Sequence, residues 1–354
     1  MCDVEVLSFP EAYDFISDFS LSENIFLGDK KSVFVEIGPG IDKRNADGFY
    51  QFTQECSSLN LVIVGVVTTG SEYLPATFFE SFDILISDSK TSQESVFVGD
   101  VSAVIDNIGQ NIRKNPQAAL VLAQLLRQRA YINVSRGLVL ESLAYAMLQS
   151  GSEFKAWLQQ RGEPDPFIDD EPVVLGTRLG NELDICLNRP HRANAISSEM
   201  RDDLSELLQV ALFDETVRTV KLSGAGKSFC SGGDLAEFGL VDFPPEGHLT
   251  RMFRNPARFV HDMTDRVEAY LHGVCAGAGI EIPAFASRIF ADESVEIFLP
   301  EIAMGLIPGA GGTVSLPRRI GAQKTLFLAI TGRKLAFEEA LKWGLVDEAY
   351  GWQT

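Results

Sequence analysis

Short β-branched segments alternate with helical patterns along this chain, and this alternation restricts the fold more than any other feature. Two segments in the first half predict buried strands because they are short, apolar and bounded by turn residues: residues 32–37 (SVFVEI) and 61–67 (LVIVGVV). Four predicted strands follow in the second half: ELDICL, TVKLSG, AYLHGV and RIFAD. The helical pattern SSEMRDDLSELLQVALF lies between the first two of these. We therefore predict an α/β fold.

Residues 101–160 have a different pattern, in which apolar residues recur three and four positions apart, as in amphipathic helices. Asn115 and Ser135 precede two of these runs and are candidate N-caps. The acidic, proline-containing segment 162–172 (GEPDPFIDDEP) then has the composition of a linker. We place one domain on each side of it, residues 1–165 and residues 172–354.

The two halves also share a faint similarity. The segment from Gly65 (GVVTTGSEYLPATFFESFDILISDS) matches the segment from Gly273 (GVCAGAGIEIPAFASRIFADES) at several glycine, proline and aspartate positions once four residues are inserted. Alternating α/β sequences also produce chance matches of this kind. A shared ancestry of the two halves and a chance similarity therefore both stay open.

Composition argues against several kinds of function. The formal charge of -19 and the isoelectric point near 4.6 argue against binding to nucleic acid or to an anionic membrane through a general basic surface. The acidic start MCDVEVLSFPEAYDF is unlike a secretory signal, and no long apolar run occurs, so we expect a cytoplasmic protein that does not enter the membrane. The five cysteines contain no C-x-x-C pair and the four histidines are scattered, so we expect no metal site.

Three glycine-rich segments carry candidate chemistry: residues 227–238 (KSFCSGGDLAEF), 272–285 (HGVCAGAGIEIPAF) and 298–321 (FLPEIAMGLIPGAGGTVSLPRRIG). Each places glycine where a strand ends and a helix begins, so that backbone N–H groups become available to an oxygen atom. Two such turns can converge on one thioester carbonyl and stabilise an enolate. Glu281 and Glu301 can fold back to the same place, where two acids divide acid and base work.

Each of these features also has a purely structural interpretation. Glycine runs usually form turns. Glu281 suits the first turn of a helix, where the helix dipole favours an acid by about 0.3–1 kcal/mol, and Glu301 suits a solvated loop. The order and spacing of the segments, taken together, favour the functional interpretation.

In that order the segments resemble the crotonase superfamily, also called the enoyl-CoA hydratase/isomerase family. The resemblance covers residues 174–349 and rests on LNRPHRANAI, SFCSGGDL, GAGIE, LPEIAMGLIPGAGGT and ITGRKLAFEEALKWGLVDE. It implies a crotonase-like spiral of ββα units. It also implies that the backbone N–H groups of Gly233 and Ala278 form an oxyanion hole, and that Glu281 and Glu301 are the catalytic residues.

The same resemblance implies that an acyl-CoA thioester binds in a bent form, with its adenine near residues 189–193 and 233–236. No cofactor is expected, because coenzyme A is part of the substrate. Family members form homo-oligomers, so a trimer or a hexamer is expected here. The residues implied in binding substrate and CoA are Arg189, Arg192, Ala193, Gly233, Asp234, Leu235 and Ala236.

Two departures from the family pattern matter. Ala278 stands where many relatives have glycine, so its N–H is kept but its methyl group must avoid the thioester. The matching half stops near residue 352, where the family continues into C-terminal helices, and residues 103–160 look like those helices placed before the catalytic half. We therefore expect a degenerate first copy whose helices pack on the second copy, of the same or of a neighbouring subunit.

The expected reaction is syn addition of water to a 2-enoyl-CoA, with the two glutamates as base and acid in an order that stays open. Two alternatives remain: an enoyl-CoA isomerase, which needs one carboxylate, and a non-catalytic protein that binds CoA thioesters or supports assembly. The acyl chain is not legible from residues 239–262. In that segment Phe243, Leu249, Met252 and Phe253 either line an acyl pocket or pack a short helix.

Overall fold

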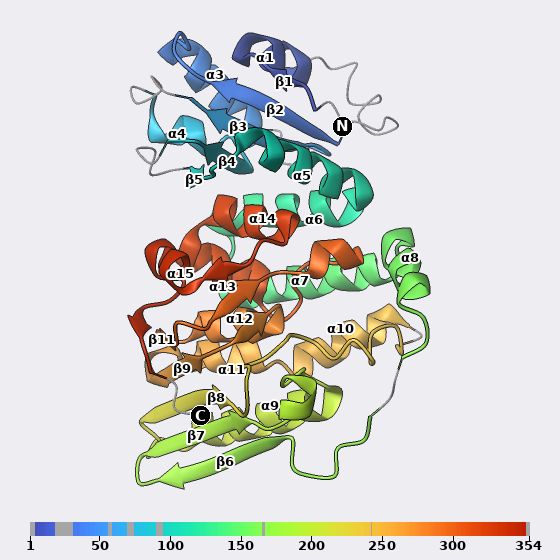
Figure 1. Cartoon of the computed structure of the whole chain (residues 1–354), viewed down its shortest axis with the longest axis vertical. Coiled ribbons are helices and arrows are strands. Elements are labelled where there is room, and N and C mark those ends of the chain that lie inside the picture. The colour runs from blue at the N-terminus through green and yellow to red at the C-terminus, as the bar shows by residue number, and fades with distance from the viewer. Residues whose placement is uncertain are drawn as a thin grey trace. The chain divides into compact units, whose positions relative to one another are not determined.

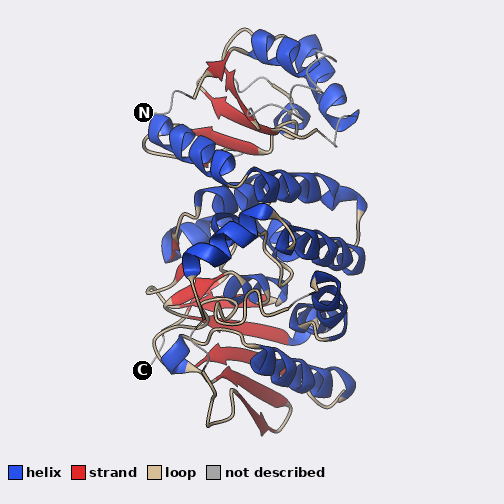
Figure 2. Ribbon diagram, turned by 90° about the vertical axis from the view of Figure 1, so that its right-hand side faces the viewer, coloured by secondary structure: helices blue, strands red, loops and turns tan. Residues whose placement is uncertain are grey.

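The computed structural model describes residues 4–17, 31–55, 59–68, 74–89, 95–164, 167–241 and 243–351. They form two compact units, in each of which strands alternate with helices (Figure 1 and Figure 2). One unit consists of residues 1–131 with 322–331, and the other of residues 132–321 with 332–354. These compact units do not coincide with the predicted domains, residues 1–165 and 172–354. The predicted domains are two halves of the sequence, and this division stays a prediction.

The first unit contains a five-stranded parallel sheet with strand order β1-β2-β3-β4-β5. Its strands are β1 (Val6–Leu7), β2 (Ser32–Ile37), β3 (Val62–Val67), β4 (Ile84–Ser87) and β5 (Val96–Phe97). Its helices are α1 (Phe9–Ser17), α3 (Lys43–Glu55), α4 (Ala76–Phe79), α5 (Val101–Lys114), α6 (Pro116–Arg127), η1 (Gln128–Tyr131) and α14 (Ala322–Thr331). The predicted strands at 32–37 and 61–67 are confirmed, because both are buried between parallel neighbours.

Two kinds of contact hold this unit together. Buried aromatic rings fill the space between the sheet and its helices, and the rings of Phe9, Phe49 and Phe78 lie 5.2–6.1 Å apart. The helix α14 packs on α5, α6 and β4, although it comes from a distant part of the sequence. Asn111 Nδ2 donates a hydrogen bond of 2.8 Å to the Ile330 carbonyl, which fixes α14 against α5.

The second unit contains a six-stranded sheet with order β14-β11-β9-β8-β7-β6 and a three-stranded sheet with order β10-β12-β13. Its strands are β6 (Val174–Leu179), β7 (Glu182–Leu187), β8 (Thr219–Gly224), β9 (Val267–Leu271), β10 (Val274–Ala276), β11 (Arg288–Ala291), β12 (Glu296–Phe298), β13 (Leu335–Ala336) and β14 (Glu348–Ala349). The hairpin partner β6 runs antiparallel to β7, and the other neighbours in the large sheet are parallel.

Helices of the second unit cover the sheets and carry the loops of the candidate site. They are α7 (Val134–Gln149), α8 (Ser152–Arg161), η2 (Pro190–Arg192), α9 (Ser198–Phe213), α10 (Pro244–Phe253), α11 (Pro256–Asp262), η3 (Thr264–Arg266), α12 (Ala278–Glu281), η4 (Pro283–Phe285), η5 (Glu301–Met304), α13 (Gly312–Ile320) and α15 (Phe337–Trp343). The helix α7 packs on α10 and α13. Helical sequence from the first half therefore packs against the second half of the same chain, as expected.

The N-caps of α6 and α7 test the sequence analysis in detail. Asn115 is the N-cap residue of α6, as predicted. The prediction of Ser135 as a cap is wrong, because α7 begins at Val134 and the side chain of Asn133 accepts a hydrogen bond of 3.0 Å from the Arg136 N–H. The amide oxygen of Asn133 satisfies a backbone donor that the helix itself leaves free.

The two sheets share a topology. The parallel strands β7, β8, β9, β11 and β14 lie in chain order, as β1 to β5 do in the first unit. Val64 pairs with Ile84, and Glu268 pairs with Arg288, so the two crossovers have the same length. Crossovers of equal length need no four-residue insertion, unlike the sequence alignment of Gly65 with Gly273. The shared order favours a degenerate first copy, and the ancestry of the halves stays a prediction.

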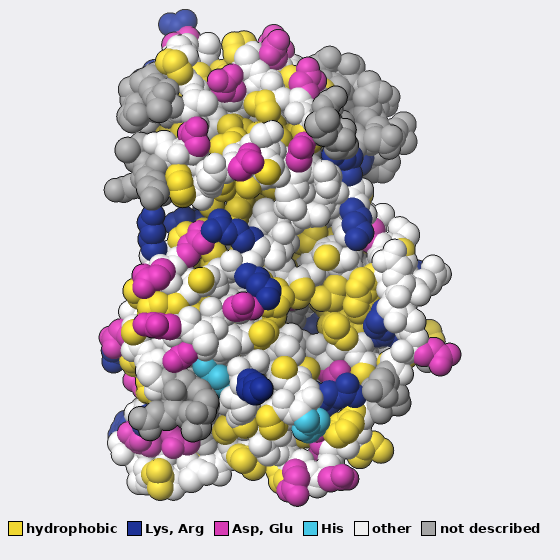
Figure 3. Space-filling model, in the orientation of Figure 1, with side chains coloured by type: hydrophobic (Ala, Val, Ile, Leu, Met, Phe, Trp, Pro, Cys, Tyr) yellow, Lys and Arg dark blue, Asp and Glu magenta, His cyan; other side chains and the backbone are white. Residues whose placement is uncertain are grey.

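The surface shows no gathering of basic side chains on the face drawn in Figure 3, where Lys and Arg lie among Asp and Glu. None of the helices within the described ranges has both the length and the apolar composition needed to span a bilayer.

Candidate active site

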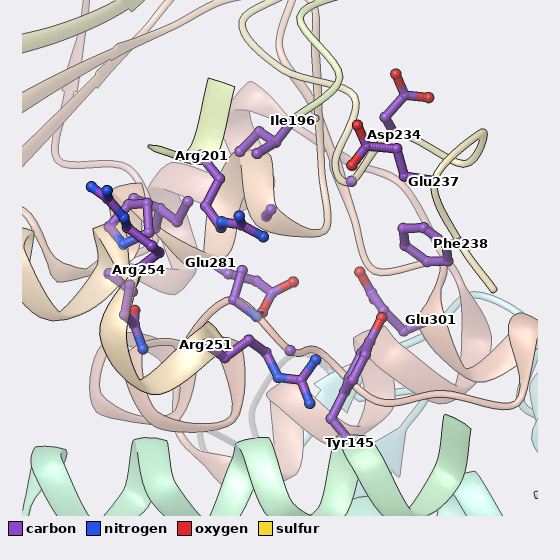
Figure 4. Close-up of a pocket in the computed structure, with 18 of the residues that line it drawn as sticks. Tyr145, Ile196, Arg201, Asp234, Glu237, Phe238, Arg251, Arg254, Glu281 and Glu301 are labelled. Atoms are coloured by element: carbon purple, nitrogen blue, oxygen red, sulfur yellow. The ribbon is translucent and has the colours of Figure 1, made fainter. Parts of the chain in front are cut away.

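A cavity of about 250 Å³ lies within the second unit, and Figure 4 shows it in close-up. Residues from α7, α9, α10, α12, η5 and the loops after β8 and before α13 line it. Five of the residues predicted for the site are on its wall: Gly233, Asp234, Ala278, Glu281 and Glu301. The structure therefore brings together three segments that are far apart in the sequence.

Two neighbouring loops place the amides of Gly233 and Ala278 on this wall. The Cys230 N–H donates to the Val274 carbonyl (3.1 Å), and the Ala276 N–H donates to the Cys230 carbonyl (3.0 Å), so the two loops run side by side. The Asp234 N–H donates a hydrogen bond to the Ile196 carbonyl, and the neighbouring Gly233 N–H takes no part in this strand pairing.

Both amides are available to a ligand. Ala278 is the first residue of α12, so its N–H has no intrahelical acceptor. Within the described part of the chain, neither the Gly233 N–H nor the Ala278 N–H donates a hydrogen bond. A methyl group at position 233 would lie 2.8 Å from the Phe238 ring, so that ring would have to shift.

Glu281 ends the short helix α12, and its side chain is only 2% exposed. Its Oε2 accepts hydrogen bonds from the N–H groups of Ala310 (2.8 Å) and Gly312 (2.9 Å). Burial raises the pKa of this carboxyl well above its usual range, and the charges of Glu301 and Glu141 raise it further. Glu281 is therefore a buried acid of the cavity rather than a solvent-exposed acid at a helix start.

Glu301 begins η5 and is 8% exposed, so it is not a solvated loop acid. Its Oε2 is buried and has no hydrogen-bond partner among the residues that the structure describes. Burial raises the pKa of Glu301 to about 8. A methyl group on Gly277 would collide with Glu301 Oε1 and lie 3.7 Å from Glu281 Oε1, so the two carboxyl groups flank one point.

A third buried glutamate, Glu141 of α7, was not predicted. Its Oε1 accepts from the Gly311 N–H (2.7 Å), and its Oε2 accepts from the Thr313 N–H (2.9 Å) and hydroxyl (2.7 Å). Burial raises the pKa of Glu141 to about 7. Successive amides of the turn at residues 310–313 thus bind alternately to Glu281 and Glu141, so Glu141 helps to hold the turn that positions Glu281.

The sequence does not single out Glu141. Apolar residues of α7 lie on its exposed side (Val139, Leu140, Leu143 and Met147) as well as on its buried side, so the sequence shows no distinct apolar stripe that contains Glu141.

Tyr145 and three arginines complete the cavity and were also not predicted. Tyr145 lies one turn after Glu141 on α7, and the guanidinium of Arg251 lies 4.7 Å from its ring centre. Burial raises the pKa of the Tyr145 phenol. Arg201 and Arg254 line the same cavity.

The structure does not support Arg189 as a CoA contact. Its side chain is 1% exposed, and Nε and Nη1 lie 2.7 Å and 3.0 Å from the carboxylates of Asp169 and Asp234. Nη1 also donates to the Ala195 carbonyl (2.6 Å). This buried cation holds the loop at residues 189–195 in place, and it is not on the cavity wall.

The other predicted CoA contacts lie outside the cavity. Arg192 stands over the ring of Phe167 at 5.1 Å, and Ala193 has left-handed backbone with φ 49°. Leu235 is exposed, and the Ala236 N–H donates to Asp234 Oδ1 (3.0 Å). These contacts with CoA stay predictions.

The segment at residues 239–262 contributes both polar side chains (Arg251, Arg254 and Asn255) and apolar ones (Val241, Pro256 and Ala257) to the cavity wall. Phe243, Leu249 and Phe253 are largely exposed, and neither they nor Met252 line it. The interpretation that these three residues pack the core of a short helix is wrong, because they are exposed, whereas their part in an acyl pocket stays a prediction. In the described parts of the chain, no three His, Cys, Asp or Glu side chains converge as metal ligands do.

Comparison with known proteins adds an independent result. The family model described as enoyl-CoA hydratase/isomerase matches residues 181–352. The 1,2-epoxyphenylacetyl-CoA isomerase of Escherichia coli (strain K12) is 34% identical over 168 residues, which cover 46% of this chain and 64% of that protein. The carnitinyl-CoA dehydratase of Proteus mirabilis (strain HI4320) is 31% identical over 182 residues, which cover 48% of this chain and 65% of that protein.

A solved structure titled as the enoyl-CoA hydratase of Thermoplasma volcanium GSS1 is 33% identical, with a TM-score of 0.47, and the match covers 51% of this chain and 72% of that one. The chain spans less than two thirds of the two enzymes named above. The predicted crotonase-like α/β fold is confirmed. Through residues 181–352, the chain belongs to the crotonase superfamily, the enoyl-CoA hydratase/isomerase family.

Proposed function

We propose that this protein is an enoyl-CoA hydratase that adds water to a 2-enoyl-CoA thioester. The observation that carries the proposal is the meeting, on the wall of one cavity, of two buried carboxyl groups and two backbone N–H groups that have no acceptor among the described residues. A thioester oxygen between the amides of Gly233 and Ala278 gains negative charge as the enolate forms. One such donor stabilises a transition state by about 3 kcal/mol.

The carboxyl pair supplies the proton transfers. In the proposed reaction one of Glu281 and Glu301 activates water for attack on the β-carbon, and the other delivers a proton to the α-carbon. Both pKa values are raised, so the pair holds a proton at neutral pH. The two groups titrate as one coupled unit, and the reaction needs one ionised and one protonated carboxyl.

Product analysis with crotonyl-CoA tests this proposal. We expect the purified protein to remove the conjugated enone absorbance and to form 3-hydroxybutyryl-CoA. A protein that binds butyryl-CoA tightly and leaves crotonyl-CoA unchanged would instead be a non-catalytic binding protein, and the hydratase proposal would fail.

An enoyl-CoA isomerase is the second candidate. The unpartnered Oε2 of Glu301 favours it, because a single carboxyl group with a free oxygen is able to carry a proton between two carbons of the acyl chain. Conversion of 3-hexenoyl-CoA to 2-hexenoyl-CoA without a hydrated product would support the isomerase and contradict the hydratase.

We also propose that the acyl-CoA thioester is the only ligand needed and that the protein forms a homo-oligomer, either a trimer or a hexamer, as the resemblance implies. Light scattering on the purified protein measures the mass. A monomer of 38.8 kDa would contradict the proposed assembly.

A further inference from the structure

Three arginines gather on one side of the cavity. Arg201 comes from α9, Arg251 from α10, and Arg254 from the residue after α10. In Figure 4 they lie on the side away from Asp234, Glu237 and Phe238, with Glu281 between the two groups. The cavity of this acidic protein is therefore basic at one end.

The partners of these arginines leave them available. Arg201 lies 2.8 Å from Asp202, and Arg254 lies 3.2 Å from Glu206, but these acids are 39% and 64% exposed. Exposed ion pairs of this kind contribute only about 0–1 kcal/mol, so a ligand is able to compete for the two guanidinium groups.

Arg251 has no carboxylate within 4.0 Å among the residues that the structure describes, although it is partly buried. Its Nε donates to Ser142 Oγ (2.9 Å), its Nη2 donates to the Ser142 carbonyl (3.2 Å), and one face covers the Tyr145 ring. A guanidinium provides five donors, so part of its hydrogen-bonding capacity remains for a ligand.

Burial lowers the pKa of Arg251, and the like charge of Arg201 lowers it too, whereas Tyr145 and Glu141 raise it. Among the described residues no carboxylate lies within 4.0 Å of Arg251, so Glu141 offsets only part of the cost of holding two guanidinium groups close together in a half-buried cavity. An apolar acyl chain would leave this cost in place. A carboxylate would remove it and form charge-assisted hydrogen bonds.

We propose that Arg201, Arg251 and Arg254 bind a carboxylate at the far end of the acyl group, so that the preferred substrate is the CoA thioester of a short unsaturated dicarboxylic acid. The inference rests on the proposed function, because the amides of Gly233 and Ala278 define where the thioester lies. The resemblance implies that CoA lies near residues 233–236, and Figure 4 shows the arginines on the side of the cavity away from Asp234 and Glu237, so an acyl chain that extends away from CoA would reach them.

The arginines could instead bind the phosphate groups of CoA, so the experiment compares two CoA thioesters that differ only in the acyl carboxylate. Glutaryl-CoA and butyryl-CoA are saturated, so neither is hydrated, and they differ in the terminal carboxylate. Titration calorimetry with both ligands therefore measures recognition of the carboxylate whether or not the protein is a hydratase. The kinetic counterparts are glutaconyl-CoA and crotonyl-CoA.

We expect the wild-type protein to bind glutaryl-CoA about 10- to 100-fold more tightly than butyryl-CoA, as hydrogen bonds to charged groups imply. Arg251→Met and Arg254→Met should each reduce this ratio of affinities at least threefold. Arg258→Met is the matched control, because Arg258 lies on α11 outside the cavity and pairs with Asp262.

Arg251 also faces Glu141, whose pKa it lowers, so Arg251→Met is able to disturb the fold. Arg254→Met is the second variant for this reason. The ion-pair partner of Arg254, Glu206, is exposed, so loss of the guanidinium group leaves no buried charge and the fold is kept. Equal affinity of the wild-type protein for both ligands would overturn the proposal. Equal weakening of both ligands by Arg254→Met would overturn it too, because the arginines would then bind the CoA phosphates. Failure of the hydratase proposal alone would leave the binding ratio intact and abolish only the turnover of glutaconyl-CoA and crotonyl-CoA.

Discussion

Replacement of Glu141 tests whether a helix from the first half of the chain positions Glu281, a proposed catalytic residue of the second half. Glu141 accepts hydrogen bonds from the Gly311 N–H, the Thr313 N–H and the Thr313 hydroxyl. In Glu141→Gln one acceptor oxygen remains and an NH₂ group faces a backbone donor. Each buried amide left without an acceptor costs about 1–3 kcal/mol, so Gln should lower the free energy of unfolding by that amount.

Glu141→Ala leaves both amides without an acceptor, so the loss should be about 2–6 kcal/mol. Because the same turn binds Glu281 through Ala310 and Gly312, catalysis should fall as well. A displacement of about 1 Å at a reacting group lowers a rate by about 100-fold, and we expect crotonyl-CoA hydration to fall 10- to 100-fold in Glu141→Gln.

Urea denaturation followed by circular dichroism measures stability, and loss of the enone absorbance measures hydration. Glu163→Gln is the matched control, because Glu163 is exposed between α8 and β6. If both Glu141 variants unfold like the wild-type protein and hydrate crotonyl-CoA at its rate, the turn does not depend on Glu141 and the reasoning is refuted.

Three further predictions follow from the same structure. Arg189→Met should lower the free energy of unfolding by about 3–5 kcal/mol in urea, because it removes the guanidinium group that pairs with the buried carboxylates of Asp169 and Asp234; a weaker affinity for CoA with unchanged stability would contradict this. Because the folded protein keeps a proton on Glu301 up to a pKa of about 8, against an ordinary value of 4.5, the free energy of unfolding should fall as pH rises between these values. One such proton contributes about 1.4 kcal/mol per pH unit, and Glu301→Gln should flatten the curve by that amount; an identical slope in both proteins would refute the assignment. Gly277→Ala should lower hydration at least tenfold, because φ is 47° and the new methyl group displaces Glu301, whereas a wild-type rate would show that Glu301 is not held there.

Much of the fold was predictable because buried parallel strands leave a local pattern. SVFVEI, ELDICL and TVKLSG correspond to β2, β7 and β8 residue for residue, since each is flanked by parallel or hairpin partners and buries apolar side chains. The position of α14 was not predictable. Its own sequence shows an apolar helix, and only the three-dimensional arrangement shows that it packs in the first unit.

The site divides in the same way. Glycine-rich turns and the two acids after them have a local signature, and these residues do line one cavity. Glu141, Tyr145 and Arg251 belong to helices whose patterns indicate only packing, and their roles depend on which helix faces the turn at residues 310–313. Arg189 is the opposite case: the resemblance implied that it contacts CoA, but its side chain is buried and paired with a carboxylate.

The most direct test of the central claim compares crotonyl-CoA hydration by the wild-type protein with that of Glu281→Gln and Glu301→Gln, using circular dichroism to verify that each variant is folded. General acid–base catalysis contributes about 100- to 10,000-fold, so each variant should lose at least 100-fold in kcat. Near-normal rates in both folded variants would contradict the account.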